Sequence, residues 1–381
     1  MIDIEHALRA LVACDGSDLH LKVGSVPTAR VHGELVPLAL GSEGRPLEPS
    51  DTEQVVRALL RENGRMAEFE RSHEIELSYE IEGVARFRVN AFQQRDGIAV
   101  VARAIPHRIP TIEELALPPA IARLAEEQRG IVLVTGTTGA GKSTTLAAMI
   151  DHINNTRAAH IMMIEDPIEF VHANRRSIIG QREVGADTES FKGALRRVLR
   201  QDPDVILIGE LRDEETVQTA ISAAETGHLV LSTIHTLDAA ESINRMLDFF
   251  PAHHHQLVRS TLAGTLRGVI SQRLVPAADG GRVAACEVLC MTGRVREMIL
   301  DHTQTGMLGT VIAEGEYYGM QTFDQALHAH VQAGRVTVED AMVAATNRND
   351  LKLMLDTAGR RGTTMADVPM LREEDEASEG A

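Results

Sequence analysis

The sequence predicts an α/β protein in which a parallel sheet covered by helices follows a smaller α+β domain. From residue 119 onward, short continuous apolar runs alternate with helical patterns, which is typical of a parallel sheet buried on both faces. Before residue 92, strands instead alternate polar and apolar residues, which indicates a sheet with one exposed face. Four prolines between residues 104 and 119 separate the two patterns.

The first domain is expected at residues 1–107. Ile4, Leu8 and Leu11 lie on one face of a predicted helix, and residues 18–23, 26–38, 75–81 and 85–91 have strand character. A linker is placed at residues 108–118, and the second domain at residues 119–355. Its later part is expected to be helical at residues 239–250, 252–272, 292–301 and 323–333. Residues 356–381 form an acidic tail with the composition of a disordered segment.

A phosphate-binding loop is the most specific motif in the chain. The apolar strand 131–134 is followed by GTTGAGKST and then by helical spacing, as the pattern G-x-x-x-x-G-K-[ST] requires. Such a loop directs backbone N–H groups and a helix N-terminus at a polyphosphate. Lys142 is expected on the β- and γ-phosphates, and Ser143 is expected to ligate Mg²⁺. The predicted nucleotide-binding residues are Gly136, Thr137, Thr138, Gly139, Ala140, Gly141, Lys142, Ser143 and Thr144.

Two carboxylates are expected beside this loop, because each follows an apolar strand at its carboxyl end. Glu165 ends the strand 160–164, and Glu210 follows the run 205–208 after Gly209. Glu210 is therefore a predicted Mg²⁺ ligand and a residue that orients the attacking water, and Glu165 is the competing general base.

Histidines and arginines give weaker signals. His228 and His235 bracket the apolar strand 229–233. Arg86 and Arg88 share one face of a predicted strand, and Arg103 follows a further apolar run. Side chains of this kind are often solvated, but they can also act as arginine fingers on a phosphate bound by a neighbouring domain or subunit.

Composition narrows the possible partners. The net charge of −17 argues against a generally basic, nucleic-acid-binding surface. No secretory signal is recognised at the start, and no apolar run reaches membrane-spanning length. The three cysteines Cys14, Cys286 and Cys290 suit a reducing cytosol and are too few for a tetrahedral four-cysteine zinc site.

Taken in order, these motifs resemble the PilT/PilU family, the hexameric retraction ATPases of type IV pili within the secretion-ATPase superfamily. IEDPIEF at 164–170 resembles the family's Asp box and is followed by QREVG at 181–185. LRQDPDVILIGELRD at 199–213 resembles its Walker B segment, and AETGHLVLSTIHT at 224–236 its His box. SDLHLKVG and ARFRVNAF resemble segments of its PAS-like N-terminal domain.

The resemblance implies a RecA-like ATPase domain that uses ATP and Mg²⁺. It implies nucleotide-responsive roles for His228 and His235 and an arginine-finger role for Arg88, with Arg86 and Arg103 as the other candidates, supplied by an adjoining subunit. It also implies a homo-hexamer that is cytoplasmic, is peripheral at the inner face of the cytoplasmic membrane and works on a pilus platform protein, with a paralogous retraction ATPase as a further partner. Neither nucleic acid nor zinc is expected.

Several alternatives stay open at this point. GRVREMILD at 293–301 keeps only Arg296 and Ile299 of the retraction element AIRNLIRE, and GMQTFDQAL at 319–327 is closer to PilU. The sequence therefore does not distinguish a principal from an accessory retraction motor. A nucleic-acid translocase on the same core and a low-turnover nucleotide-regulated signalling module are the rival functions.

Overall fold

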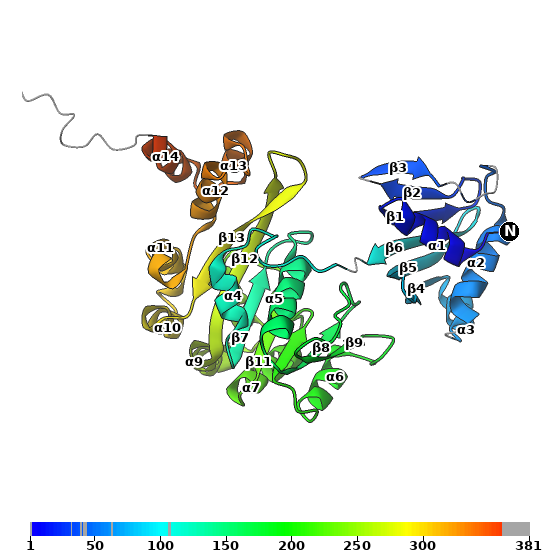
Figure 1. Cartoon of the computed structure of the whole chain (residues 1–381). Helices are drawn as coiled ribbons and strands as arrows, with labels where there is room; N and C mark the ends of the chain where they lie inside the picture. Colours follow the sequence, from blue (N-terminus) through cyan, green and yellow to red (C-terminus); the bar gives the residue numbers. More distant parts are fainter. Residues whose placement is uncertain are drawn as a thin grey trace, which may run out of the picture.

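The computed structural model describes residues 2–31, 33–38, 40, 44–61, 64–105 and 108–359. The N-terminal domain contains a six-stranded antiparallel sheet in the order β3-β2-β1-β6-β5-β4 and three helices (Figure 1). Its elements are α1 (Ile4–Ala13), β1 (Gly16–Lys22), β2 (Thr28–Val31), β3 (Glu34–Pro37), α2 (Pro49–Arg61), α3 (Met66–Ser72), β4 (Glu74–Ile81), β5 (Ala85–Gln94) and β6 (Gly97–Ile105).

Alternation along these strands divides the sheet into an apolar and a polar face. Leu19, Phe87 and Val89 pack with the helices in one buried core. Arg86 and Arg88 alternate with them and therefore lie on the opposite face. The open face of the N-terminal sheet thus carries cationic side chains.

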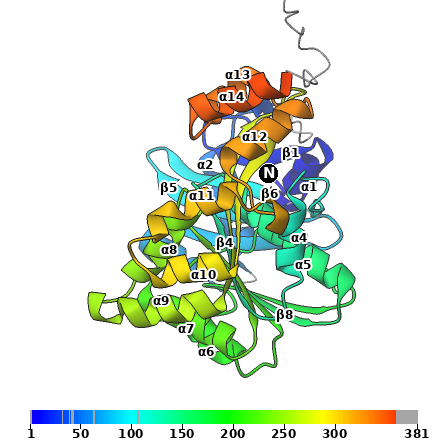
Figure 2. The ribbon, with the colours of Figure 1, turned by 90° about the vertical axis from the view of Figure 1, so that its left-hand side faces the viewer.

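The second domain contains a seven-stranded sheet in the order β13-β12-β7-β11-β10-β8-β9 (Figure 1). Figure 2 shows α5 on one side of this sheet and α7, α9 and α10 on the other. Neighbouring strands from β12 to β9 are parallel, and β13 pairs antiparallel with β12. The strands and the helices up to α9 are α4 (Pro119–Ala125), β7 (Gly130–Thr135), α5 (Lys142–Thr156), β8 (His160–Glu165), β9 (Ile178–Glu183), α6 (Phe191–Val198), β10 (Val205–Ile208), α7 (Glu214–Glu225), β11 (Leu229–Ile234), α8 (Ala239–Asp248), α9 (His255–Thr265), β12 (Leu266–Pro276) and β13 (Arg282–Cys290).

The C-terminal part adds α10 (Gly293–Leu300), α11 (Leu308–Ala313), α12 (Phe323–Gln332), α13 (Val338–Ala344) and α14 (Arg348–Gly359), and the short 3₁₀ turns η1 (Ala252–His254), η2 (Thr305–Met307) and η3 (Glu316–Tyr318). Leu327, Ala341 and Leu351 of α12–α14 pack with Val275 and Ala285 at the far end of the β12–β13 hairpin. Within the described residues, no helix is long and apolar enough to cross a membrane.

Both faces of the second sheet are buried, which explains the unbroken apolar runs in its strands. Ile131 and Leu133 of β7 belong to a core shared with α6–α11, whereas Val132 and Val134 belong to the core shared with α4 and α5. Successive residues of a strand point to opposite faces, so each apolar pair packs against a different helical layer. The predicted α/β class, with a parallel sheet covered on both faces and a preceding α+β domain, is confirmed.

Two features of the second domain differ from the expectations. The helix predicted at residues 252–272 is wrong in its second half, because α9 ends at Thr265 and β12 begins at Leu266. β12 is stabilised by pairing with β7 on one side and β13 on the other, and this long-range pairing overrides the local helical spacing. The edge strand β9 was not foreseen.

The segments around the second domain also differ in detail. Between β6 and α4, Ile112 and Leu117 are buried in the core of α4 and α5, so the predicted linker packs against the second domain. At the other end, α14 continues to Gly359, so residues 356–359 of the predicted tail are helical. The remainder of that tail, residues 360–381, lies outside the described residues.

The two-sided burial of β7 leads to a stability prediction. We expect Leu133→Ala to lower the free energy of unfolding of the second domain by about 2–5 kcal/mol, because it leaves a cavity in a packed core. Denaturant titration measures the loss. Leu257→Ala is the matched control, because that side chain is 68% exposed, and we expect a change of less than about 0.5 kcal/mol. Equal losses in the two variants would contradict this account of the sheet.

Candidate functional site: a phosphate loop facing two strand-end acids

The phosphate loop has the backbone conformation that its glycines allow. β7 ends at Thr135 and α5 begins at Lys142. Gly136 has a φ of 141° and Gly141 a φ of 88°, in the region that disfavours side chains. A Cβ atom on Gly136 would lie 2.5 Å from the backbone oxygen of Gln272 in β12. The loop therefore requires glycine here, both for its conformation and for its close approach to the neighbouring strand.

Lys142 is held inside the loop. Its Nζ donates to the carbonyl oxygens of Gly136 at 2.9 Å and Thr137 at 3.0 Å, and it lies 3.5 Å from Nδ1 of His235. Burial lowers the pKa of Lys142, while the charges of Glu210 and Glu169 oppose that shift. α5 begins without a side-chain cap, so its first N–H groups face the same space as the ammonium.

Glu210 and His235 meet at the carboxyl ends of β10 and β11. His235 Nε2 lies 3.4 Å from Glu210 Oε1, and Arg212 Nε donates to Glu210 Oε2 at 2.8 Å. Arg212 also lies 3.8 Å from Asp166 Oδ2. These contacts form a continuous polar chain that runs from Lys142 through His235 to Glu210 after β10, and through Arg212 to Asp166 after β8.

Glu165 lies deeper, at the end of β8. Gln181 Nε2 of β9 donates to its Oε1 at 3.0 Å. The pKa of Glu165 is raised to about 7, mainly by burial and to a lesser extent by the charges of Glu169 and Glu183, while the Gln181 hydrogen bond opposes the shift. The carboxyl therefore changes protonation near neutral pH, which is the range useful to a general base.

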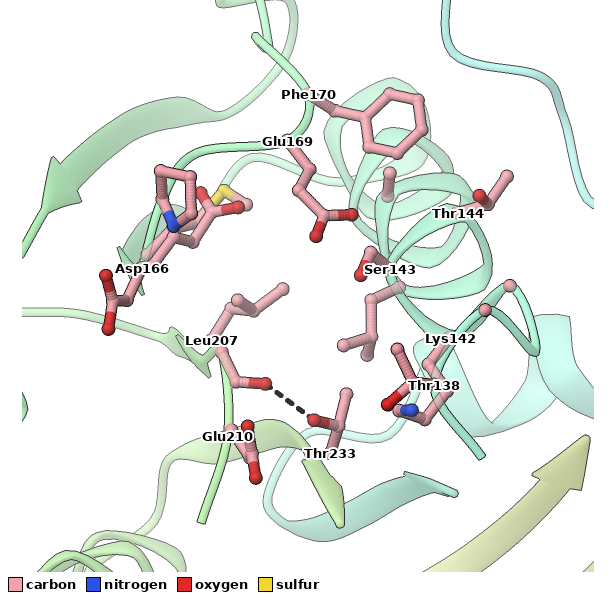
Figure 3. A pocket seen from close by; sticks show the side chains of 18 of the residues that line it. Thr138, Lys142, Ser143, Thr144, Asp166, Glu169, Phe170, Leu207, Glu210 and Thr233 are labelled. Carbon is pink, nitrogen blue, oxygen red and sulfur yellow. Dashed lines mark hydrogen bonds between the residues drawn. The ribbon is translucent and has the colours of Figure 1, made fainter. Parts of the chain in front are cut away.

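One pocket of about 570 Å³ is lined by Lys142, Asp166, Glu210, Arg212 and His235. Figure 3 shows Lys142, Ser143 and Thr144 on one side of it, with Asp166 and Glu210 opposite and Glu169 above them. Thr138, Gly139, Gly141 and Glu165 belong to the same lining. Carboxylate and hydroxyl oxygens are the ligands that Mg²⁺ prefers, so Ser143, Glu210 and their acidic neighbours fit that ion chemically.

Arginines from the N-terminal sheet reach this pocket within the same chain. Arg88 and Arg103 line it together with the phosphate loop. Arg88 is paired with Glu76, and Arg103 Nε donates to Asp18 at 2.7 Å. Within this chain, the N-terminal sheet thus turns its polar face to the loop. The supply of an arginine by an adjoining subunit stays a prediction. Arg86 is instead paired with Glu183.

His228 does not join the pocket, contrary to its predicted role in nucleotide binding. It precedes β11, whereas His235 follows it, and the two ends of a strand lie at opposite edges of the sheet. Its Nδ1 lies 2.9 Å from the carbonyl oxygen of Ala223 and 3.2 Å from Oγ1 of Thr226, where it supports the end of α7.

Sequence reasoning missed the contacts of four further polar side chains. Thr145 Oγ1 donates to Gln272 Oε1 at 2.8 Å, which ties the first turn of α5 to β12. On β9, Gln181 donates to Glu165 at the end of β8, and Glu183 accepts from the backbone N–H of Ile168 in the loop that follows. The QREVG motif marked both β9 residues, but no edge strand was predicted to present them.

A second hollow of about 1020 Å³ adjoins the loop. It shares Gly141, Thr144 and Leu274 with the first pocket and extends along the β12–β13 turn towards Arg335. Together the two spaces flank the start of α5, so a ligand with its phosphates on the loop has room for a larger group beside them.

Comparison with known proteins now identifies the family. A family model described as type II/IV secretion system protein matches residues 72–359, which is most of the chain. The chain belongs to this family.

Three similar relatives are named for type IV pili or for twitching motility. The type IV pilus retraction ATPase PilT of Pseudomonas aeruginosa is 45% identical over 340 residues, covering 89% of this chain and 97% of the relative. The type IV pilus ATPase PilU of the same organism is 42% identical, covering 93% and 91%. A twitching motility protein of Neisseria gonorrhoeae is 45% identical, covering 85% and 86%. The resemblance to the PilT/PilU family is thereby confirmed.

Solved structures agree with this placement. The crystal structure of the pilus retraction motor PilT with bound ADP matches with a TM-score of 0.85 at 40% identity, covering 93% of this chain and all of that one. The Legionella pneumophila ATPase DotB matches with a TM-score of 0.74 at 28% identity, covering 90% and 93%. The second domain accordingly has the fold of these ATPases.

The raised pKa of Glu165 leads to a pH prediction for stability. Between about pH 4.5 and 7, the folded protein holds a proton on Glu165 that the unfolded chain releases. The free energy of unfolding of the wild type should therefore fall, relative to that of Glu165→Gln, as the pH rises through this window. Denaturant titrations at pH 4.5, 6 and 8 measure the difference. Glu287, whose pKa burial also raises to about 7, is present in both proteins and cancels. Parallel pH curves would show that the Glu165 carboxyl is not perturbed.

Proposed function

We propose that this chain is an ATP-hydrolysing motor that powers the retraction of type IV pili. The observation that carries the proposal is the pocket in which the phosphate loop, two strand-end carboxylates and two arginines face one space. This set comprises the protein groups that phosphate-loop enzymes use to transfer a phosphoryl group to water. The 45% identity to a PilT along nearly its whole length supports retraction as the work performed.

In this mechanism the loop amides and Lys142 bind the β- and γ-phosphates, and the hollow beside α5 receives the nucleoside. Ser143 and Glu210 would hold Mg²⁺, which neutralises phosphate charge when bound. Glu210 or Glu165 orients the attacking water and accepts its proton. His235, between Lys142 and Glu210, links the phosphate end of the site to the carboxylate.

The arginines complete the electrostatics of the pocket. Arg88 and Arg103 lie on a domain that the linker joins to the second domain, so their distance from the phosphates depends on how the two domains close. Positive charge aimed at the transferring phosphoryl group stabilises the charge that develops there. Domain closure is thereby coupled to hydrolysis, which is the property a motor requires.

The assembly and the partners are part of the proposal. We infer a homo-hexamer at the cytoplasmic face of the inner membrane that acts on the pilus platform protein, either as the principal motor or beside a paralogous ATPase. α10, which contains the altered GRVREMILD element, exposes Arg294 and Arg296 and buries Ile299. Its charged face is a candidate contact for the platform, and its buried residue keeps the helix on the core.

Two substitutions test the site assignment. Lys142→Ala removes the cation on the phosphates, and we expect both nucleotide binding and ATP turnover to be lost. Glu210→Gln keeps the size of the side chain but removes its charge, so binding should persist while turnover falls by about 10²-fold or more. Fluorescent-nucleotide titration and phosphate release measure the two effects.

Lys352→Ala is the matched control for Lys142→Ala, because Lys352 is exposed on α14 far from the loop in sequence and should have no effect. Full turnover in either Lys142→Ala or Glu210→Gln would show that the site is wrongly assigned.

A deletion in the native host tests the direction of work. Cells that lack a retraction motor should carry abundant pili and fail to twitch, because assembly continues unopposed. Electron microscopy and a twitching assay measure both. Bald cells would indicate an assembly motor instead, and wild-type twitching would indicate a role outside retraction or an accessory role.

A further inference from the structure

The carboxylate of Glu183 joins the two domains. Glu183 ends the edge strand β9, and its oxygens accept hydrogen bonds from Ser78 Oγ at 2.7 and 2.8 Å and from an Arg86 terminal nitrogen at 2.9 Å. Ser78 and Arg86 belong to β4 and β5 of the N-terminal domain. The Glu183 side chain is 6% exposed and that of Arg86 is 19% exposed, so this ion pair is largely shielded from water.

The same carboxylate also holds the loop that follows β8. The backbone N–H of Ile168 donates to Glu183 Oε2 at 3.2 Å. Gln181 lies two residues earlier on β9, hence on the same face, and donates to Glu165 and to the carbonyl oxygen of Phe170 at 2.8 Å. Asp166 and Glu169 of this loop line the nucleotide pocket. One face of β9 therefore fixes the acidic side of the site.

In the N-terminal domain, Ser78 lies in a row of paired residues that contains Arg88 and Arg103, the two arginines of the pocket. Ser78 on β4 is paired with Arg88 on β5, Arg88 with Arg103 on β6, and Arg103 with Asp18 on β1. Paired residues of antiparallel strands lie side by side on one face, and neighbouring strands are about 4.8 Å apart. Glu183 thus holds Ser78 at one end of a row whose next two members, Arg88 and Arg103, line the pocket.

We propose that Glu183 is a positioning residue that clasps the N-terminal domain to the ATPase domain and sets Arg88 and Arg103 against the bound phosphates. The inference rests on the proposed ATPase function. If the domains separate, the shielded carboxylate of Glu183 loses the charge of Arg86 and is left uncompensated, which costs free energy. The ion pair therefore stabilises the arrangement in which the two domains are in contact. The clasp acts on catalysis through the arginines and leaves the phosphate loop itself intact.

Kinetics of the full-length protein test the clasp. Glu183→Gln keeps the length of the side chain but removes the charge that holds Arg86. We expect kcat to fall by about 10²-fold, the size of effect that a displacement of about 1 Å can have, while ADP affinity changes less than about twofold. Arg86→Gln should have the same effect, and the double variant should be no worse than either single variant. A wild-type kcat in Glu183→Gln overturns the proposal.

The double variant Glu183→Gln/Arg88→Ala distinguishes a positioning role of Glu183 from a general loss of structure. If Glu183 acts by placing Arg88, then Arg88→Ala should cost much less in the Glu183→Gln background than in the wild type. Fully additive losses overturn the proposal. Glu80→Gln is the matched control: Glu80 also contacts Arg86, at 3.8 Å, but lies within the N-terminal domain and is 61% exposed. It should leave kcat unchanged.

A distance measurement keeps the test independent of activity. Spin labels on cysteines introduced at the exposed residues Glu82 and Glu189, in a variant with Cys14, Cys286 and Cys290 replaced by alanine, report the separation of the domains. Dilution with unlabelled protein removes distances between subunits. Glu183→Gln should lengthen or broaden the distance distribution, and an unchanged distribution overturns the clasp. A wild type without ATP turnover would defeat the proposed function and leave this readout to decide the clasp.

Discussion

Parallel pairing at the centre of the second sheet is the constraint on which the site depends. Thr135 of β7 is in register with Ile234 of β11, and Ile208 of β10 with both Ser232 of β11 and Ile164 of β8. All four strands therefore end at one edge of the sheet. Whatever follows them must meet there, which is why a lysine, a histidine and two glutamates from distant parts of the chain share one pocket.

This constraint also explains how much of the site the sequence could predict. Loop glycines and strand-end acids have local signatures, because apolar runs bounded by polar residues mark both the strand and its end. Lys142, Glu165 and Glu210 were predicted for that reason, and the structure brings them together. His228 borders the same apolar strand as His235, but it lies at the wrong end of that strand for the pocket.

What could not be predicted depends on long-range pairing. β12 has helical spacing near its start and becomes a strand because β7 and β13 supply hydrogen-bonding partners on both sides. β9 is short and only partly apolar, and it pairs along one edge with β8. The contacts of Glu183 with Ser78 and Arg86 depend on the N-terminal sheet lying beside β9, and no local pattern in residues 178–183 predicts that arrangement.

Both arginines of the pocket already form ion pairs with carboxylates of their own domain. These ion pairs affect how nucleotide binding and domain closure can be linked. Arg88 is paired with Glu76, and Arg103 with Asp18, whose side chain is 7% exposed. A phosphate that recruits either arginine must compete with a carboxylate of the same domain. The gain from that exchange is the difference between two ion pairs, so it is much smaller than the energy of either pair alone. In the proposed motor, a small difference of this kind would let ATP favour the closed arrangement and let product release reverse it, because a ligand shifts a conformational equilibrium only by its differential affinity for the two states.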